Sequence, residues 1–410
     1  MIAFVCSAVL ACTERGLFFC RKPLEGLYDG DPVAMVAASP TRSAAVTDSG
    51  ELSIWGLLET TTALFTPAGS ADARINREVF GNVRVRQVAL GEAHTVVLLC
   101  NGHVYTHGRG AYGVLGHGTH DRVQVMQRVA APAAFTAESV VFVATGLYSS
   151  FFVRAGGDLW SCGRNQHGEL GVGHSASCLS PVPVPAFGDG SVAMVSAGLH
   201  AMAVMTDKSL FAWGMNCYGQ LGTGDYEKRE SPTAVEFSNV VTAATGELHT
   251  IVLNTAGQVY TCGGAVFSAL GTTSHYTTCV KLTPVDGLSG VVNVAAGVHT
   301  GAAVTTLGEL LVWGYSREND YESWWPGYAP VSQSQVPVLY ELPARVGRHG
   351  HSLPAPLAIA MAMGTHTRIG ADCVFRDFPP ELVQRVVEAC ERPAPADGFA
   401  GRRLLLHGAV

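Results

Sequence analysis

Residues 91–108 read GEAHTVVLLCNGHVYTHG and contain one complete strand–turn–strand unit. Residues 95–100 and 103–107 are rich in β-branched and aromatic side chains, which favour strands. Asn101 and Gly102 separate the two runs, and this dipeptide suits the positive φ angles of a type I′ hairpin turn. We therefore expect a β-hairpin here, bounded by glycine at both ends.

The same phrase recurs along the chain at a nearly constant interval. Its closing glycine falls at positions 56, 108, 163, 214, 263 and 314, so that successive copies are 49 to 55 residues apart. A period near fifty residues fits a propeller blade of about four strands. A degenerate first copy covers residues 7–20, with Arg21 in place of the closing glycine. These seven units predict an all-β, seven-bladed β-propeller over residues 1–370.

The first unit lacks the Gly-x-x-His phrase that precedes most others, and residues 359–366, IAMAMGTH, supply a spare copy. We expect a C-terminal strand to complete the blade that the N-terminus begins. Such closure by N- and C-terminal strands removes the exposed sheet edge that invites aggregation.

Three units continue after the closing glycine with a glycine-rich loop. The loops read GRGAYGVLGHG at residues 108–118, GRNQHGELGVG at 163–173 and GMNCYGQLGTG at 214–224. Together with the Ala-Gly-x-His lead-in and the Trp-Gly close, this pattern resembles the regulator of chromosome condensation repeat. The resemblance covers about residues 1–370 and implies a propeller that binds proteins. Some members of that family act on a small GTPase.

Two patterns within the repeats could suggest other chemistry. Residues 108–113 form a G-x-G-x-x-G, but a dinucleotide site needs a helix after it and an acidic residue about twenty positions on. Because this segment is one of several equivalent loops, its glycines favour a turn. Histidines recur in the lead-in phrase, at His94, His200, His249, His299 and His366. They fit either a ring of metal ligands or a structural hydrogen-bonding position, and recurrence in one slot favours the structural role. We predict no cofactor and no metal site.

Composition narrows the possible partners and location. Charged residues make up 14% of the chain and the net charge is −7, which gives no strong nucleic-acid signal. No apolar run is long enough for a transmembrane helix, and no Lys or Arg precedes the apolar start at Ile2, so there is no convincing signal peptide. The expectation is an intracellular protein, cytoplasmic or nuclear, with no membrane association.

The departures from the repeat are the candidate partner-binding sites. After Gly314 an insertion replaces the glycine loop, and it carries Arg and aromatic side chains typical of binding hot spots. The predicted residues there are Arg317, Tyr321, Trp324, Trp325 and Tyr328. The alternative is that the two tryptophans simply plug the propeller surface. A second long excursion, residues 121–139, contributes Arg122 and Arg128.

Residues 371–410 do not show the repeat pattern. Pro380 at a helix start and apolar residues such as Leu382 and Val386 predict a short helical tail. The phrase resembles the opening of an F-box, which implies binding of a Skp-type adaptor through Pro380, Leu382 and Val386. The alternative is a plain capping helix.

Two function classes remain open. One is a noncatalytic protein–protein interaction scaffold, which the tail could convert into a substrate adaptor of a ubiquitin ligase. The other is a guanine-nucleotide exchange factor for a small GTPase, which needs a wedge and complementary charge but no catalytic side chain. We assign no catalytic residue. Because three of the seven units have lost the glycine loop, the scaffold is favoured.

Overall fold

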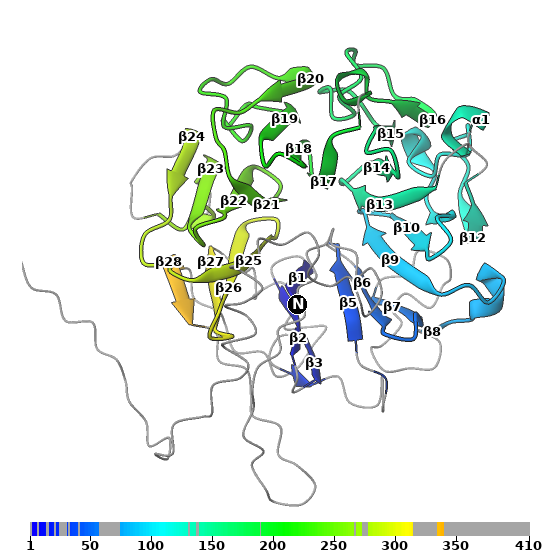
Figure 1. The fold of residues 1–410 in the computed structure, drawn as a ribbon, viewed down its shortest axis with the longest axis horizontal. Coiled ribbons are helices and arrows are strands. Elements are labelled where there is room, and N and C mark those ends of the chain that lie inside the picture. Colours follow the sequence, from blue (N-terminus) through cyan, green and yellow to red (C-terminus); the bar gives the residue numbers. More distant parts are fainter. Residues whose placement is uncertain are drawn as a thin grey trace, which may run out of the picture.

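The structure, a computed structural model, describes residues 31–56, 74–129, 132–136 and 139–314, with short gaps at 32, 40–41, 189, 266–267 and 273–277. It also places the backbone of strands within residues 2–23 and at 334–339. These segments form a ring of four-stranded antiparallel sheets around a central axis (Figure 1). No helix in these segments is long and apolar enough to span a membrane.

Six of the sheets are built from the repeats, and in each the four strands follow one another in chain order. Blade 1 contains β5 (Val33–Ala38), β6 (Arg42–Thr47), β7 (Leu52–Gly56) and β8 (Arg74–Ile75). Blade 2 contains β9 (Val85–Leu90), β10 (His94–Leu99), β11 (Val104–Gly108) and β12 (Val123–Arg128). Blade 3 contains β13 (Val140–Thr145), β14 (Ser149–Arg154), β15 (Leu159–Gly163) and β16 (Cys178–Pro183).

The second half of the ring repeats this plan. Blade 4 contains β17 (Val192–Ala197), β18 (His200–Met205), β19 (Leu210–Gly214) and β20 (Arg229–Ala234). Blade 5 contains β21 (Val240–Thr245), β22 (His249–Asn254), β23 (Val259–Gly264) and β24 (Thr278–Pro284). Blade 6 contains β25 (Val291–Ala296), β26 (Thr300–Thr305), β27 (Leu310–Gly314) and β28 (Ser334–Leu339). Short helices lie between strands: α1 (Ala133–Thr136) and the 3-10 turns Arg77–Phe80, Ala111–Gly113 and Pro185–Phe187.

The all-β propeller is as predicted, but the seven-bladed ring closed by N- and C-terminal strands is wrong. Six blades carry the full repeat. A further N-terminal sheet is built from residues 2–23 alone, as β1 (Ile2–Val5), β2 (Ala8–Thr13), β3 (Gly16–Phe19) and β4 (Lys22–Pro23). Its β1 lies between the first strands of blades 6 and 1. Because residues 2–5 already supply the innermost strand, no place is left there for a C-terminal one. Residues 359–366 and the helical tail lie outside the described residues.

The first strand of each blade lies nearest the axis and contacts the first strands of its neighbours (Figure 1). The second strands are almost completely buried, as in β10, where every side chain from His94 to Leu99 is inside. A strand covered on both faces reads as a continuous apolar run, which explains the sequence TVVLL in this unit. The hairpin forms as predicted, but its turn is not type I′: Gly102 has φ +81° while Asn101 does not have a positive φ, and Gly102 N donates to the Leu99 carbonyl at 2.9 Å.

Antiparallel order within each blade sorts the connections onto two faces of the ring. The turns between first and second strands and the long loops between third and fourth strands share one face, which we call the loop face. In the described residues it includes segments 91–93, 109–122, 146–148, 164–177, 198–199, 215–228, 246–248 and 297–299. The opposite face carries the hairpin turns between second and third strands.

Candidate functional site

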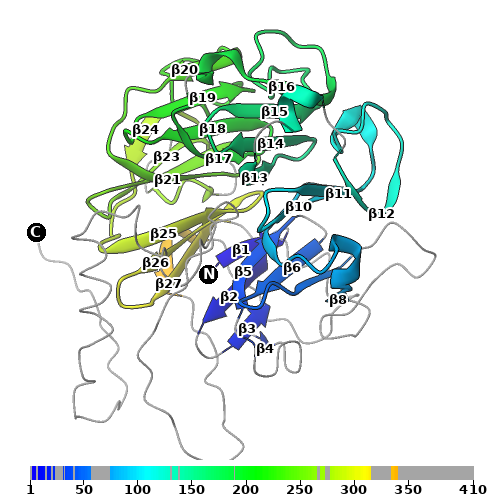
Figure 2. The same ribbon diagram turned by 45° about the vertical axis from the view of Figure 1, so that its right-hand side comes forward.

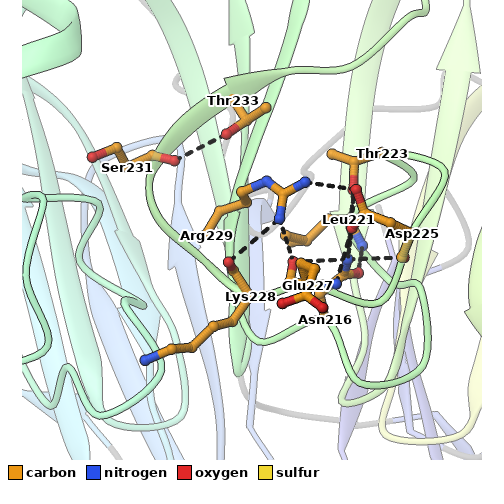
Figure 3. Close-up of polar contacts among 9 residues, drawn as sticks. All are labelled: Asn216, Leu221, Thr223, Asp225, Glu227, Lys228, Arg229, Ser231 and Thr233. Atoms are coloured by element: carbon orange, nitrogen blue, oxygen red, sulfur yellow. Dashed lines mark hydrogen bonds and ion pairs between the residues drawn. The ribbon is translucent and has the colours of Figure 1, made fainter.

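The glycine loops are held in one conformation by a buried asparagine. In blade 4, Asn216 Nδ2 donates to the carbonyls of Asp225 and Glu227, both at 3.0 Å, and Asn216 Oδ1 accepts from Leu221 N at 3.0 Å (Figure 3). Asn165 plays the same part in blade 3, with Leu170 N at 2.9 Å. The side chain thus ties the two ends of each loop together, so the loop presents a fixed surface.

The formal G-x-G-x-x-G at residues 108–113 is the same loop with glycine in the asparagine position. A Cβ at Gly110 would lie 1.9 Å from the Asp121 carbonyl oxygen, so backbone fills the space that the asparagine side chain occupies elsewhere. The segment continues into a single 3-10 turn, Ala111–Gly113, and not into an α-helix. The glycines therefore serve a tight turn, as expected.

One position at the start of each second strand lies opposite the closing glycine, and in three blades its side chain hydrogen-bonds to the next blade. It is filled by Arg42, His94, Ser149, His200, His249 and Thr300. His94 Nε2 lies 3.0 Å from Ser150 Oγ of the next blade, and His200 Nε2 lies 2.7 Å from Thr250 Oγ1. Arg42 reaches Thr95 Oγ1 at 2.9 Å in the same way.

His94 and His200 thus have the predicted structural hydrogen-bonding role, and the bonds run across a blade junction. The position is not always histidine, because blade 3 has Ser149 there, and His299 lies one residue before Thr300, which occupies it in blade 6. For His249 the next blade offers Gly301, which has no hydroxyl, and neither ring nitrogen has a partner at hydrogen-bonding geometry. Burial lowers the pKa of His249 to about 4, with His299 adding to the shift and the Thr300 backbone opposing it.

Each described loop is also capped by the blade that follows it. The carbonyl before the loop leucine accepts a hydroxyl or indole hydrogen bond in each case: Val114 from Ser150 Oγ at 2.7 Å, Glu169 from Trp213 Nε1 at 2.8 Å, Gln220 from Thr250 Oγ1 at 2.8 Å and Ala269 from Trp313 Nε1 at 3.0 Å. The Val114 and Gln220 carbonyls also accept from Cys162 Sγ and Cys262 Sγ. Where the donor is a hydroxyl, the residue opposite it on the third strand is a cysteine, Cys162 or Cys262. Where the donor is a tryptophan on the third strand, the residue opposite it on the second strand is small, Ala201 or Gly301. The loops are therefore fixed to two blades at once.

On this rigid base, two tyrosines and an arginine form a cluster that bridges blades 2 and 3. The Tyr112 and Tyr148 rings meet edge to face, with centroids 6.0 Å apart. The Arg164 guanidinium carbon lies 6.0 Å from the Tyr112 centroid and 5.6 Å from that of Tyr148, within cation–π range. Tyr112 is 39% exposed. We call these three residues the Tyr–Arg cluster.

Hydrogen bonds hold the Tyr–Arg cluster in place. Gln166 Oε1 accepts from Arg164 Nη2 at 2.7 Å and from its Nε at 3.1 Å, and the Glu169 carboxylate lies 3.8 Å from that Nε. A hydrogen bond to the Glu92 carboxylate and partial burial raise the pKa of Tyr148 to about 12, so the phenol stays protonated at neutral pH. The cluster is preorganised, and it contains no nucleophile–base pair.

A second exposed group lies on the loop of blade 4. Arg229 Nη2 pairs with Asp225 Oδ2 at 2.6 Å (Figure 3). Lys228 Nζ pairs with Glu230 Oε1 at 2.9 Å. Between them Tyr226 is 53% exposed, and its hydroxyl lies 2.9 Å from Thr278 Oγ1 of blade 5. The loop face thus offers aromatic and charged side chains at two places along the ring.

The structure tests the sequence-predicted binding residues only in part. Arg122 and Arg128 are exposed, but they stand at the two ends of strand β12 and not on one long loop. The other predicted residues lie outside the described residues, namely Arg317, Tyr321, Trp324, Trp325, Tyr328, Pro380, Leu382 and Val386. Tyr112, Tyr148 and Arg164 were missed. Their signal is that Tyr112 and Arg164 sit at variable positions of the repeated loop.

No group of His, Cys, Asp and Glu in the described segments could hold a metal ion. His117 places Nε2 at 2.9 Å from Thr106 Oγ1. The loop face offers fixed aromatic edges, guanidinium groups and carboxylates, and this chemistry suits the binding of another molecule.

Comparisons with known proteins agree with this geometry. Regulator of chromosome condensation (RCC1) repeats are recognised at residues 101–153, 156–204 and 207–253. The ultraviolet-B receptor UVR8 of Arabidopsis thaliana is 28% identical over 66% of this chain, and the chain spans 63% of the length of that receptor. The mitochondrial RCC1 domain-containing protein RUG3 of the same plant is 28% identical over 72% of this chain and 68% of its own.

Solved structures share the fold. Human WBSCR16 superposes with a TM-score of 0.65 at 23% identity, covering 80% of this chain and 85% of that one. Yeast RCC1 (Prp20), in its complex with Kap60, gives a TM-score of 0.66 at 21% identity, covering 83% and 80%. The repeat pattern, the capped glycine loops and these likenesses lead to one conclusion: the chain is a β-propeller that contains RCC1 repeats within residues 101–253 and is similar to RCC1 repeat proteins.

Proposed function

We propose that this chain is a noncatalytic protein-binding propeller whose partner binds the loop face. The observation that carries the proposal is the Tyr–Arg cluster, in which Tyr112 is exposed while Arg164 is fixed by Gln166, Glu169 and two rings. Tyrosine and arginine are enriched among residues that dominate binding energy at protein interfaces. Side chains already held in one geometry lose little entropy on binding.

The structural relatives support a protein partner in general terms. Yeast Prp20 is described bound to Kap60, and Prp20p from Saccharomyces cerevisiae is described with its binding to Gsp1p and histones. At about 22% identity these likenesses concern the fold, and the partner of this chain is left open by them. The proposal is limited to the propeller, because the adaptor-binding tail at residues 371–410 lies outside the described residues.

The test is affinity capture with the intact chain and two variants, Tyr112→Ala and Arg164→Ala. Each variant removes one member of the Tyr–Arg cluster from the surface. Partners that use the loop face should be recovered about tenfold less by either variant, which corresponds to the loss of one hot-spot contact. The matched control is Leu307→Ala, since Leu307 is 73% exposed on the opposite face.

Equal recovery by all three variants would exclude the Tyr–Arg cluster as the binding site. The exchange-factor alternative makes a separate prediction for the same proteins. Wild type should then accelerate release of labelled nucleotide from a captured small GTPase, and both cluster variants should slow that release while Leu307→Ala leaves it unchanged. A captured GTPase whose nucleotide release is unaffected by wild type leaves the scaffold as the function.

A further inference from the structure

The outer strand of blade 2 differs from its counterparts in the ring. By register with the third strand of each blade, Met126 of β12 corresponds to Pro181 in β16, Pro232 in β20 and Pro337 in β28. Blade 5 has Leu282 at this position but carries Pro284 two residues on. Among the outer strands of blades 2 to 6, β12 is the one without proline. Proline on an edge strand blocks the addition of another strand, because it has no N–H to donate.

The same strand is more exposed than its counterparts. Four of its six residues are exposed, against one in β16, and Val125 has 68% of its surface open. Met126 is half-buried and packs against the hydrophobic cluster shared by blades 1 and 2. Both views place β12 at the outer rim of the ring, and within the described residues it pairs with β11 alone (Figures 1 and 2). A β-branched, proline-free edge with an exposed valine is a template for strand pairing.

We propose that β12 is a docking edge for an extended segment of a partner protein that pairs with it as a fifth strand and carries acidic residues at its ends. The charge of the strand argues for this occupant. Arg122 and Arg128 stand at its two ends, both exposed, and residues 122–129 contain no Asp or Glu. Three sibling blades have proline at this register and still pair their third and fourth strands, so that pairing does not need an N–H at this position. In β12 the Met126 N–H is therefore a donor that an added strand can use.

A second copy of this chain is a poorer occupant. An antiparallel pairing of two β12 strands centred on Val125 sets Arg122 of one copy opposite Arg128 of the other. Like charges directly opposite each other destabilise a strand pair. An acidic partner strand turns both positions into attractive pairs. This edge site is separate from the Tyr–Arg cluster, so it stands or falls independently of binding at the loop face.

The probe is a labelled peptide of about ten residues, alternating Val and Thr between two pairs of Glu, titrated into the intact protein. We expect saturable binding and slower hydrogen exchange at residues 123–128. Met126→Pro, which copies the sibling blades, should weaken binding at least about tenfold, and Val125→Ala should weaken it severalfold. Val125→Ala also covers the case that the proline variant folds poorly. Leu307→Ala, an equally exposed site on the opposite face, should bind as wild type does.

Three results would overturn the proposal. One is equal affinity for wild type, Met126→Pro and Val125→Ala. Another is equal affinity for a peptide flanked by Lys instead of Glu, which would remove the role of the two arginines. The third is a concentration-dependent dimer that Met126→Pro abolishes, since a second copy would then be the occupant.

Discussion

Lowering the pH from 7 to 5 should reduce the free energy of unfolding by about 6 kcal/mol, through three buried histidines of the blade junctions. Burial lowers the pKa of His94 and His200 to about 3 and that of His249 to about 4, from an ordinary 6.5. The nearby Arg42 charge adds to the shift at His94, and His249 adds to it at His200.

The direction of this pH effect follows from which state, folded or unfolded, binds protons. Below pH 6.5 the unfolded chain protonates these histidines, while the folded state keeps them neutral. Their contribution is therefore complete above pH 6.5 and is lost as the pH falls toward 3 to 4, at about 2 kcal/mol for each histidine by pH 5. Burial also lowers the pKa of His107 and His117, which adds to the loss. Asp158 and Asp225, with pKa values below 3.8, contribute only in stronger acid.

Denaturant titrations at a series of pH values measure this directly. The slope of stability against pH should show an uptake of about three protons on unfolding near pH 5. His249→Gln, which is neutral at every pH, should lower that uptake by one, and it should cost little at pH 7 because His249 has no hydrogen-bond partner. A stability that stays flat between pH 7 and 5 would show that the junction histidines are not buried as described.

The second large effect is expected at the junction between blades 5 and 6. Gly301→Thr alone places a Cβ 2.2 Å from Trp313 Cε2 and should cost about 3 kcal/mol through overpacking. Trp313→Cys alone empties a fully buried site and removes the cap on the Ala269 carbonyl, at about 4 kcal/mol. The double variant recreates the Thr250 and Cys262 pair of the preceding blade and gives His249 a hydroxyl partner.

The double variant should therefore be more stable than the sum of the two single losses, by about 2 to 3 kcal/mol in a double-mutant cycle. Chemical denaturation of the four proteins measures this coupling. If the two single losses simply add in the double variant, the Thr–Cys and Gly–Trp pairs are not interchangeable ways of packing this junction. A useful comparison is Ala201→Gly in blade 4, which changes the partner of Trp213 without creating a clash.

The repeats could be predicted because their signals are local. The hairpin at Asn101-Gly102, the run of buried residues in β10 and the glycines of the loops each report on a few neighbouring residues, and the structure contains all three, although the hairpin turn is not the predicted type I′. The blade junctions could not be predicted in the same way. His94 meets Ser150 across 56 positions of sequence, and the pairing of Trp213 with Ala201 is visible only once the register is known.

The prediction that a C-terminal strand closes the ring was wrong for a similar reason. The spare lead-in phrase at residues 359–366 matched the missing one, but residues 2–5 pair with β2 by themselves, and a short apolar run does not reveal its partner. Strand β12, next to Arg122 and ending at Arg128, is largely exposed, so it lacks the buried apolar run by which the sequence reveals the inner strands. The Tyr–Arg cluster forms between two blades, so neither unit alone predicts it.

Hydrogen–deuterium exchange of the intact protein, free and bound to a captured partner, tests the central claim most directly. If a partner binds the loop face, exchange should slow at residues 109–122, 164–177 and 215–228, and it should be unchanged in the hairpin turns around Asn101, Lys208 and Leu307. Slower exchange confined to those hairpin turns, with the three loops unaffected, would contradict the account.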